Sequence, residues 1–162
     1  MKIEEIVPGA PPASGFRFMV AVARYNSLVT DRLLEGALGS FRSAGDEISE
    51  VSVVRVPGAL ELPFVVRKAV DAGSCDGVLA LGCVIRGETG HYEAVVSGVT
   101  AGLGQINAAG LVPVVFGILT TETLLQALDR VGGKSGHKGV EGAETLLSMA
   151  RLSRSLAGGG RP

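Results

Sequence analysis

A histidine directly follows a polar, glycine-rich segment that separates a predicted buried strand from a predicted amphipathic helix. The segment covers residues 82–90, and His91 begins the helix. Backbone N–H groups in such a turn and at a helix start attract anions, and the helix dipole adds to this attraction. Histidine is the side chain that most readily exchanges a proton near neutral pH. The combination predicts acid–base chemistry on a substrate that carries a phosphate.

Polar or aromatic side chains also follow the other predicted strands. Tyr25 and Asn26 follow the first strand, Glu61 follows the second, and Phe116 lies near the end of the fourth. Because ligands bind beyond the carboxyl ends of parallel strands, we expect these residues to converge on one rim. Two of them have a structural alternative. Tyr25 could cap the core with its ring, and Glu61 could be a first-turn carboxylate favoured by the helix dipole.

Other polar residues are more simply explained by structure. Arg86 is interpreted as a solvated or ion-paired surface residue, and His137 as incidental. Arg130 and Lys138 each have the plain alternative of a cation at a helix end, without a ligand. Cys83 is interpreted as a small buried residue whose backbone matters more than its sulfur.

These residues need a scaffold, and the chain alternates between apolar segments of strand length and segments of helical periodicity. The predicted strands are 16–23, 51–56, 77–81 and 112–119, each followed by a helix, and a last helix begins near Lys138. The helix after the fourth strand is expected to have Thr120 or Thr121 as N-cap and to include Val131. Helices should stop at glycines 45, 73 and 110.

Strands that are apolar on both faces and alternate with helices indicate a parallel sheet covered on both sides. We therefore predict an α/β fold, a three-layer sandwich in which helices flank a four-stranded parallel sheet of the flavodoxin-like type. Residues 16–156 are expected to form one catalytic domain. Residues 1–15 should be a loose arm, which could exchange an edge strand with a neighbour, and residues 157–162 a disordered tail.

Composition excludes several classes of function. The 162 residues are 46% hydrophobic and carry a formal net charge of −1 without a basic tract, which argues against nucleic-acid binding. The apolar runs are too short to span a membrane, and no signal peptide precedes the domain, so a cytoplasmic protein is expected. Two cysteines without CxxC spacing and two histidines make a protein-built metal site improbable.

The ordered set of motifs resembles one family, lumazine synthase. The similarity runs from about Phe16 to Leu156 and rests on five segments, namely 24–26, 56–63, 82–91, 113–120 and 134–144. The resemblance implies the transferase that catalyses the penultimate step of riboflavin biosynthesis. That enzyme condenses 5-amino-6-(D-ribitylamino)uracil with 3,4-dihydroxy-2-butanone 4-phosphate to 6,7-dimethyl-8-ribityllumazine, phosphate and water. It requires no metal or redox cofactor.

The resemblance also implies roles for individual residues. His91 is expected to transfer protons as the catalytic residue. The residues implied to bind the ribitylaminouracil are Tyr25, Asn26, Ala59, Leu60, Glu61, Cys83, Val84, Ile85, Phe116 and Lys138. Those implied to bind the butanone phosphate are Glu88, Thr89 and Arg130. Three positions depart from the family's usual residues, because Tyr25 replaces Phe or Trp, Gly90 replaces a larger residue, and His137 replaces Asn.

The family resemblance further implies a homo-oligomer in which Phe116, Arg130 and Lys138 reach the site of a neighbouring subunit. The basic unit is a pentamer, and twelve pentamers close into an icosahedral shell in some members. The compact turn at 132–139, without an insertion, favours the shell over the isolated pentamer. Riboflavin synthase is a candidate partner, besides the two small-molecule substrates.

Two alternatives to the enzyme remain open. A flavodoxin-like module that binds a flavin or nucleotide would have the same sheet, but no glycine-rich phosphate loop follows the first strand. A structural shell component with a decayed site would not need to keep His91, Arg130 and Glu61.

Overall fold

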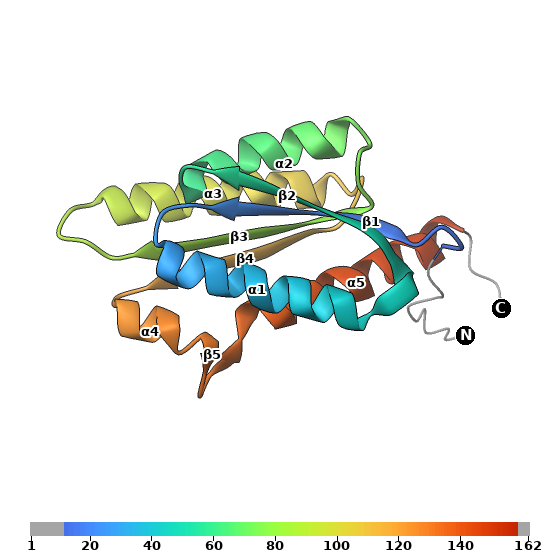
Figure 1. Cartoon of the computed structure of the whole chain (residues 1–162). Coiled ribbons are helices and arrows are strands. Elements are labelled where there is room, and N and C mark those ends of the chain that lie inside the picture. The colour runs from blue at the N-terminus through green and yellow to red at the C-terminus, as the bar shows by residue number, and fades with distance from the viewer. Residues whose placement is uncertain (1–11, 159–162) are drawn as a thin grey trace, which may run out of the picture.

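A four-stranded parallel sheet forms the centre of the structure, a computed structural model in which residues 12–158 are described (Figure 1). The strands are β1 (Phe16–Ala23), β2 (Ile48–Val56), β3 (Gly77–Ile85) and β4 (Val114–Thr121). Their order in the sheet is β2-β1-β3-β4, and all neighbouring pairs are parallel. The predicted four-stranded parallel sheet is therefore confirmed, and the carboxyl ends of the strands share one edge.

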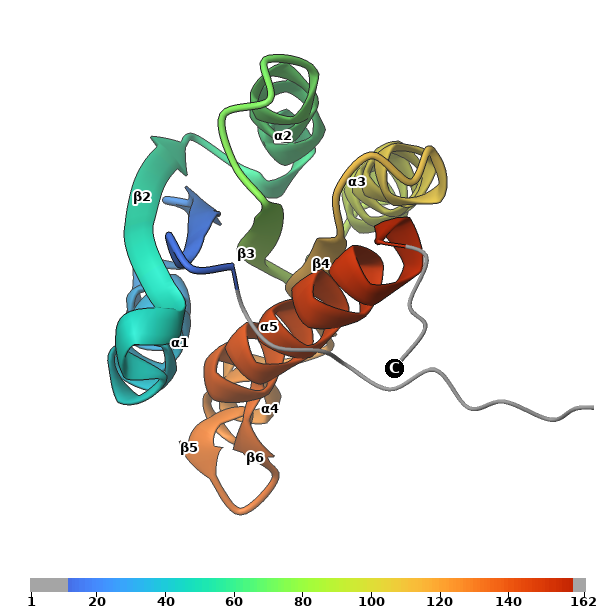
Figure 2. The same cartoon turned by 90° about the vertical axis from the view of Figure 1, so that its right-hand side faces the viewer.

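Helices cover both faces of the sheet and complete the predicted three-layer sandwich (Figure 2). One face packs against α2 (Leu62–Asp71) and α3 (His91–Ala108), and the other against α1 (Ser27–Ser43) and α5 (Lys138–Ala157). Short 3-10 turns, η1 (Gly45–Glu47) and η2 (Ala59–Glu61), precede β2 and α2. The predicted stops at glycines 45, 73 and 110 are confirmed, since each has a positive φ just after a helix.

The two apolar faces of β1 explain why the sheet is covered twice. Alternate side chains of a strand point to opposite faces. Phe18 and Val20 join the core cluster under α1 and α5, whereas Met19 and Ala21 join the one under α2 and α3. All four are almost completely buried, so both faces of β1 are covered over these residues.

The bounds of three predicted strands were wrong. Strand β2 begins at Ile48 rather than at residue 51, and two further strands have different carboxyl ends. Strand β3 continues to Ile85, so residues 82–85 belong to the strand and the polar connection is only 86–90. Strand β4 runs from Val114 to Thr121 rather than from 112 to 119. In both cases pairing decides the end, because β3 and β4 stay in register up to Ile85 and Thr121. Periodicity of one segment does not contain this information.

The region between β4 and α5 also differs from the prediction. The N-cap of α4 (Leu124–Leu128) is Thr123, whose hydroxyl accepts from the Gln126 N–H, and not Thr120 or Thr121. The helix lasts five residues. Val131 belongs to a small antiparallel hairpin instead, formed by β5 (Val131–Gly133) and β6 (Gly136–His137). Glycines on both strands allow the tight turn.

The ends of the chain are only partly described. The proposed arm falls mostly on residues 1–11, which lie outside the described residues, as do residues 159–162 of the proposed tail. Ala157 was predicted to be in that tail, but α5 includes it. Among the described helices, none is long and apolar enough to cross a membrane.

Candidate active site

The carboxyl ends of β1 and β2 bring an aromatic ring and a carboxylate together around a glycine. Tyr25 follows β1, and its N–H donates to the Pro57 carbonyl at 3.1 Å. A Cβ at Gly58 would lie 2.9 Å from Cδ2 of Tyr25 and 3.0 Å from Oε2 of Glu61. Gly58 also donates its N–H to that carboxylate oxygen at 2.8 Å. The missing side chain at position 58 therefore lets the ring and the carboxylate meet.

The exposure of this group decides between the two interpretations of Tyr25. The residue is 69% exposed, so the alternative that its ring caps the core is wrong. Its ring is open to stacking by a planar ligand. Glu61 ends η2 ahead of α2, and there its carboxylate does have the local partner expected of a first-turn residue. Ala59 is buried, and half-exposed Leu60 packs against α3 at Gly98.

Strand β3 reaches the same rim and is tied to the end of β1. Nδ2 of Asn26 donates to the Cys83 carbonyl at 2.8 Å. Beyond this contact, Val84 and Ile85 are half-buried. The structure thus brings Tyr25 and Asn26 together with the strand end whose backbone was predicted to bind the heterocycle.

The connection from β3 to α3 carries the predicted phosphate-binding residues and the histidine. Glu88 and Thr89 are exposed in this connection, and the N-cap of α3 is Gly90, which offers no side-chain cap. His91 is the first residue of α3 and is exposed, and its N–H donates to Oγ1 of Thr89 at 3.4 Å. Since the first amides of a helix lack intrahelical acceptors, this end of α3 suits an anion.

Arg86 holds the start of α3 against the end of β4. Its guanidinium pairs with Glu93 of α3 and, through Nε, with Glu122 at 2.7 Å. It also lies over the Tyr92 ring, 4.2 Å from the centroid. The hydrogen bond from Arg86 lowers the pKa of Glu93. The predicted structural role of Arg86 is confirmed, and its contacts fix the two residues that follow His91.

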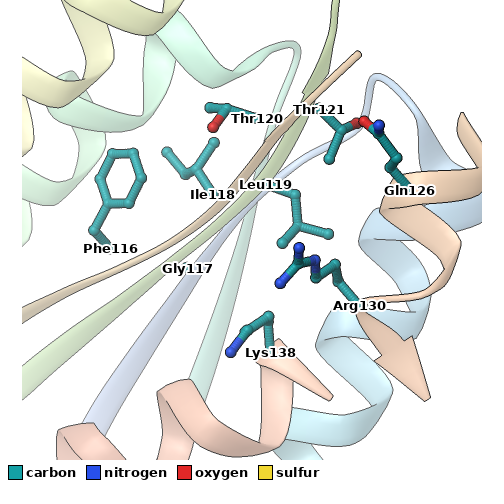
Figure 3. A pocket seen from close by; sticks show the side chains of 9 residues that line it. All are labelled: Phe116, Gly117, Ile118, Leu119, Thr120, Thr121, Gln126, Arg130 and Lys138. Atoms are coloured by element: carbon teal, nitrogen blue, oxygen red, sulfur yellow. The ribbon is translucent and has the colours of Figure 1, made fainter. Parts of the chain in front are cut away.

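A second group of predicted residues lines a cavity of about 450 Å³ along β4 (Figure 3). Phe116 projects from β4, while Arg130 and Lys138 project from the opposite side of the strand, near α4 and the start of α5. The Lys138 N–H donates to the Arg130 carbonyl at 2.8 Å, which fixes the spacing of their backbones. β4 is the outermost strand on this side, whereas Tyr25 and Glu61 lie beyond β3.

The structure therefore separates the predicted residues into two groups. We call the residues at the ends of β1, β2 and β3 together with the connection to His91 the rim group, and Phe116, Arg130 and Lys138 the edge group. Gln126 and Thr121 line the cavity of the edge group and were missed from the sequence. A signal for Gln126 was present, because Thr123 and Gln126 form a capping box with the usual spacing.

His137 has a definite structural role. Its Nδ1 accepts from the N–H groups of Gly139 and Val140 at 3.2 and 3.4 Å, so it caps α5. The interpretation of His137 as a residue outside the chemistry agrees with this contact.

The buried position of Cys83 predicts an unreactive thiol. Burial raises its pKa to about 11, and burial also raises the pKa of Cys75. Because the thiolate is the reactive form, we expect an aromatic disulfide reagent at pH 8 to label native protein slowly. Two thiols per chain should react at once in guanidinium. Rapid labelling of Cys83 in the native protein, located by peptide mass spectrometry, would contradict this environment.

Among residues 12–158, no group of three or more His, Cys, Asp and Glu side chains is arranged to hold a metal ion. The groups predicted to act in the site are His91, the carboxylate of Glu61, the cations of the edge group and the backbone amides.

Comparisons with known proteins agree on one family. A sequence model of 6,7-dimethyl-8-ribityllumazine synthase matches residues 15–154. The protein of that name from Chlorobium phaeobacteroides is 45% identical over 156 residues, covering 96% of the chain and 100% of that protein. The one from Pediococcus pentosaceus is 47% identical over 143 residues, covering 88% and 92%. The one from Desulfotalea psychrophila is 44% identical over 150 residues, covering 93% and 97%.

Proposed function

Because the chain belongs to the 6,7-dimethyl-8-ribityllumazine synthase family, transferases of riboflavin biosynthesis, we propose that it catalyses the condensation named for that family. The substrates are 5-amino-6-(D-ribitylamino)uracil and 3,4-dihydroxy-2-butanone 4-phosphate. The products are 6,7-dimethyl-8-ribityllumazine, inorganic phosphate and two molecules of water. The observation that supports this most directly is the meeting of Tyr25 and Glu61 around Gly58 on the rim that leads to His91.

The rim group has the chemistry that the uracil substrate needs. The exposed Tyr25 ring can stack on the planar heterocycle. The Glu61 carboxylate keeps acceptor capacity beyond its bond to Gly58, so it can accept hydrogen bonds from ribityl hydroxyls. Backbone groups at the end of β3, from Cys83 to Ile85, face the uracil edge in this proposal. The phosphate of the second substrate binds at Glu88 and Thr89 through main-chain N–H groups at the start of α3.

The reaction is a series of proton transfers around two C–N bonds. The 5-amino group attacks the ketone carbon, and loss of water from the carbinolamine gives an imine. Removal of the proton at C3 then expels phosphate from C4 and leaves an enol, which tautomerises to a ketone at C3. The ribitylamino nitrogen closes the ring on the remaining carbonyl carbon, and a second water is lost. His91 accepts and returns protons in these steps, which is worth about 10²–10⁴-fold in rate for general acid–base catalysis. Holding both substrates together supplies the rest.

The edge group completes the site from a neighbouring subunit. Phe116, Arg130 and Lys138 lie on the outer strand of the sheet and beside it, on the side away from Tyr25. In a homo-oligomer, of which a pentamer is the proposed unit, this edge would meet the rim group of the next copy. The Arg130 cation suits the phosphate-bearing substrate, whereas the Phe116 ring and Lys138 suit the ribitylaminouracil.

Turnover of the two substrates by the purified protein tests the proposal. Lumazine formation can be followed by its absorbance and phosphate release by a coupled assay, and the two should appear in equal amounts. Binding of a flavin without any turnover would favour the flavodoxin-like module instead. If the protein neither binds a flavin nor turns over the two substrates, the structural shell component is the alternative that remains.

Arg130 tests the proposed phosphate contact. In Arg130→Ala we expect the KM for the butanone phosphate to rise about tenfold or more, because a hydrogen bond to a charged group is lost. The KM for the uracil should change much less. Arg130→Lys should retain part of the affinity, and Arg154→Ala, which removes an exposed cation of α5, is the control. Equal increases in both KM values would point to a disturbed fold or interface.

A further inference from the structure

The backbone at Asn26 is unusual among the described residues. Within 12–158, Asn26 is the one residue other than glycine with a positive φ, at φ 59° and ψ 44°. This left-handed conformation is unfavourable for most L-residues, although asparagine tolerates it better than others. Asn26 is also the N-cap of α1, a position where an asparagine side chain usually accepts a bond from the helix. Here it makes no such cap.

The side chain is directed to another strand instead. Nδ2 of Asn26 donates to the Cys83 carbonyl at 2.8 Å. Its own backbone carbonyl accepts from Val29 and Thr30 at 2.9 and 3.0 Å and starts α1. Asn26 therefore joins three elements, the end of β1, the start of α1 and the end of β3. A glycine at this position would suit the backbone equally well but could not make the bond to β3.

The register of the sheet explains why β3 needs a partner at this point. Pairing between β1 and β3 ends at Val22 and Leu81, whereas pairing between β3 and β4 continues to Ile85. The last four residues of β3 thus extend beyond β1. Arg86 donates its N–H to the Thr121 carbonyl of β4 at 2.9 Å. Since backbone groups alternate in direction along a strand, those of Cys83 and Ile85 point away from β4.

The Asn26 amide lies on the side of β3 that faces away from β4. There it takes the place of the next N–H group of β1. From this geometry we infer that Asn26 is a positioning residue. Its side chain is a substitute rung, that is, a side-chain hydrogen bond in place of a backbone hydrogen bond between β1 and β3, and it holds the end of β3 at a fixed distance from Tyr25. The inference rests on the proposed function, since it concerns the slot between the Tyr25 ring and the backbone at 84–85 where the uracil would lie. One N–H of the Asn26 amide is taken by the Cys83 carbonyl, and the positioning role rests on this bond alone.

Three substitutions separate the amide from the backbone conformation. Asn26→Gly keeps the left-handed conformation and removes the amide. Asn26→Ala removes the amide and adds backbone strain. Asn26→Asp keeps the shape but places an acceptor against the Cys83 carbonyl. Affinity for 5-amino-6-(D-ribitylamino)uracil is measured by calorimetry, and KM and kcat by turnover. The control is Asn107→Ala, because Oδ1 of Asn107 accepts from the Val114 N–H at 2.9 Å and ties the amino end of β4.

We expect Asn26→Gly and Asn26→Ala to weaken uracil binding by the same factor, about tenfold. This should hold even though the alanine variant melts at a lower temperature. Asn26→Asp should weaken binding at least as much, and the KM for the butanone phosphate should change less than that for the uracil. Asn107→Ala should leave uracil affinity unchanged. Wild-type affinity in Asn26→Gly, or losses that follow melting temperature across all four variants, would overturn the inference.

Hydrogen exchange distinguishes failure of this inference from failure of the proposed function. If the wild-type protein neither binds nor turns over the substrates, the proposed function fails. The tie itself is then tested without substrate, by exchange of a peptide that covers residues 82–88. Faster exchange in Asn26→Gly than in the wild type, with no change in Asn107→Ala, supports the substitute rung. Equal exchange in Asn26→Gly and the wild type overturns it.

Discussion

Replacement of His91 by alanine is expected to lower kcat by about tenfold to a thousandfold while the protein remains folded, if His91 transfers protons in the proposed reaction. His91 is exposed at the first position of α3, so truncation of its side chain opens no cavity in the core. Its neighbours Tyr92 and Glu93 keep their contacts with Arg86. KM values for both substrates should change much less than kcat.

The second histidine of the chain is a matched control. His137→Asn keeps an acceptor at the N-cap of α5, because asparagine is among the best N-cap residues. This variant should retain nearly wild-type kcat and melting temperature. Steady-state kinetics gives kcat for both variants, and circular dichroism verifies that both are folded. An unchanged kcat in His91→Ala would remove His91 from the mechanism, and an equal loss in His137→Asn would show that the assay reports the fold.

A single methyl group at Gly139 is expected to destabilise the fold strongly. Gly139 is the second residue of α5, and an added Cβ would lie 2.0 Å from the Leu33 carbonyl oxygen and 2.8 Å from its carbon. These atoms belong to the backbone of α1 and cannot rotate away, so the two helices must separate. Overpacking of this kind costs about 3 kcal/mol, which corresponds to a fall of about 10 °C in Tm for a chain of this length.

Gly39→Ala is the control for this prediction. Gly39 lies in α1, and an added Cβ there would meet nothing within 4 Å. Alanine should stabilise the helix by about 0.5–1 kcal/mol relative to glycine. Thermal scans of both variants under identical conditions provide the comparison. A Tm of Gly139→Ala equal to that of the wild type would show that α1 and α5 approach less closely than the structure indicates.

Local patterns in the sequence were enough to predict most elements of the fold. Burial on both faces of β1 gives a continuous apolar run. The helix ends at glycines 45, 73 and 110 follow from the left-handed conformation that glycine allows. Prediction failed where strand pairing decides the end of an element, and where neighbouring threonines compete for the N-cap position of a helix. The end of β3 depends on its register with β4, and Thr123 replaced the two preceding threonines as N-cap because they remain in β4.

For the candidate site, the sequence by itself determined which chemical groups are present and that they follow strand ends. A strand that leads into a helix must end at the carboxyl edge, so Tyr25, Glu61 and His91 were expected on one rim. The contacts among them required the tertiary structure. The strand order places the end of β3 beside β1, which allows Asn26 to reach Cys83, and it places Phe116 on the outer edge. Sequence periodicity reports which face of an element is buried, whereas strand order and register are properties of the whole sheet. For that reason the separation into a rim group and an edge group, and the left-handed backbone at Asn26, were decided only by the folded chain.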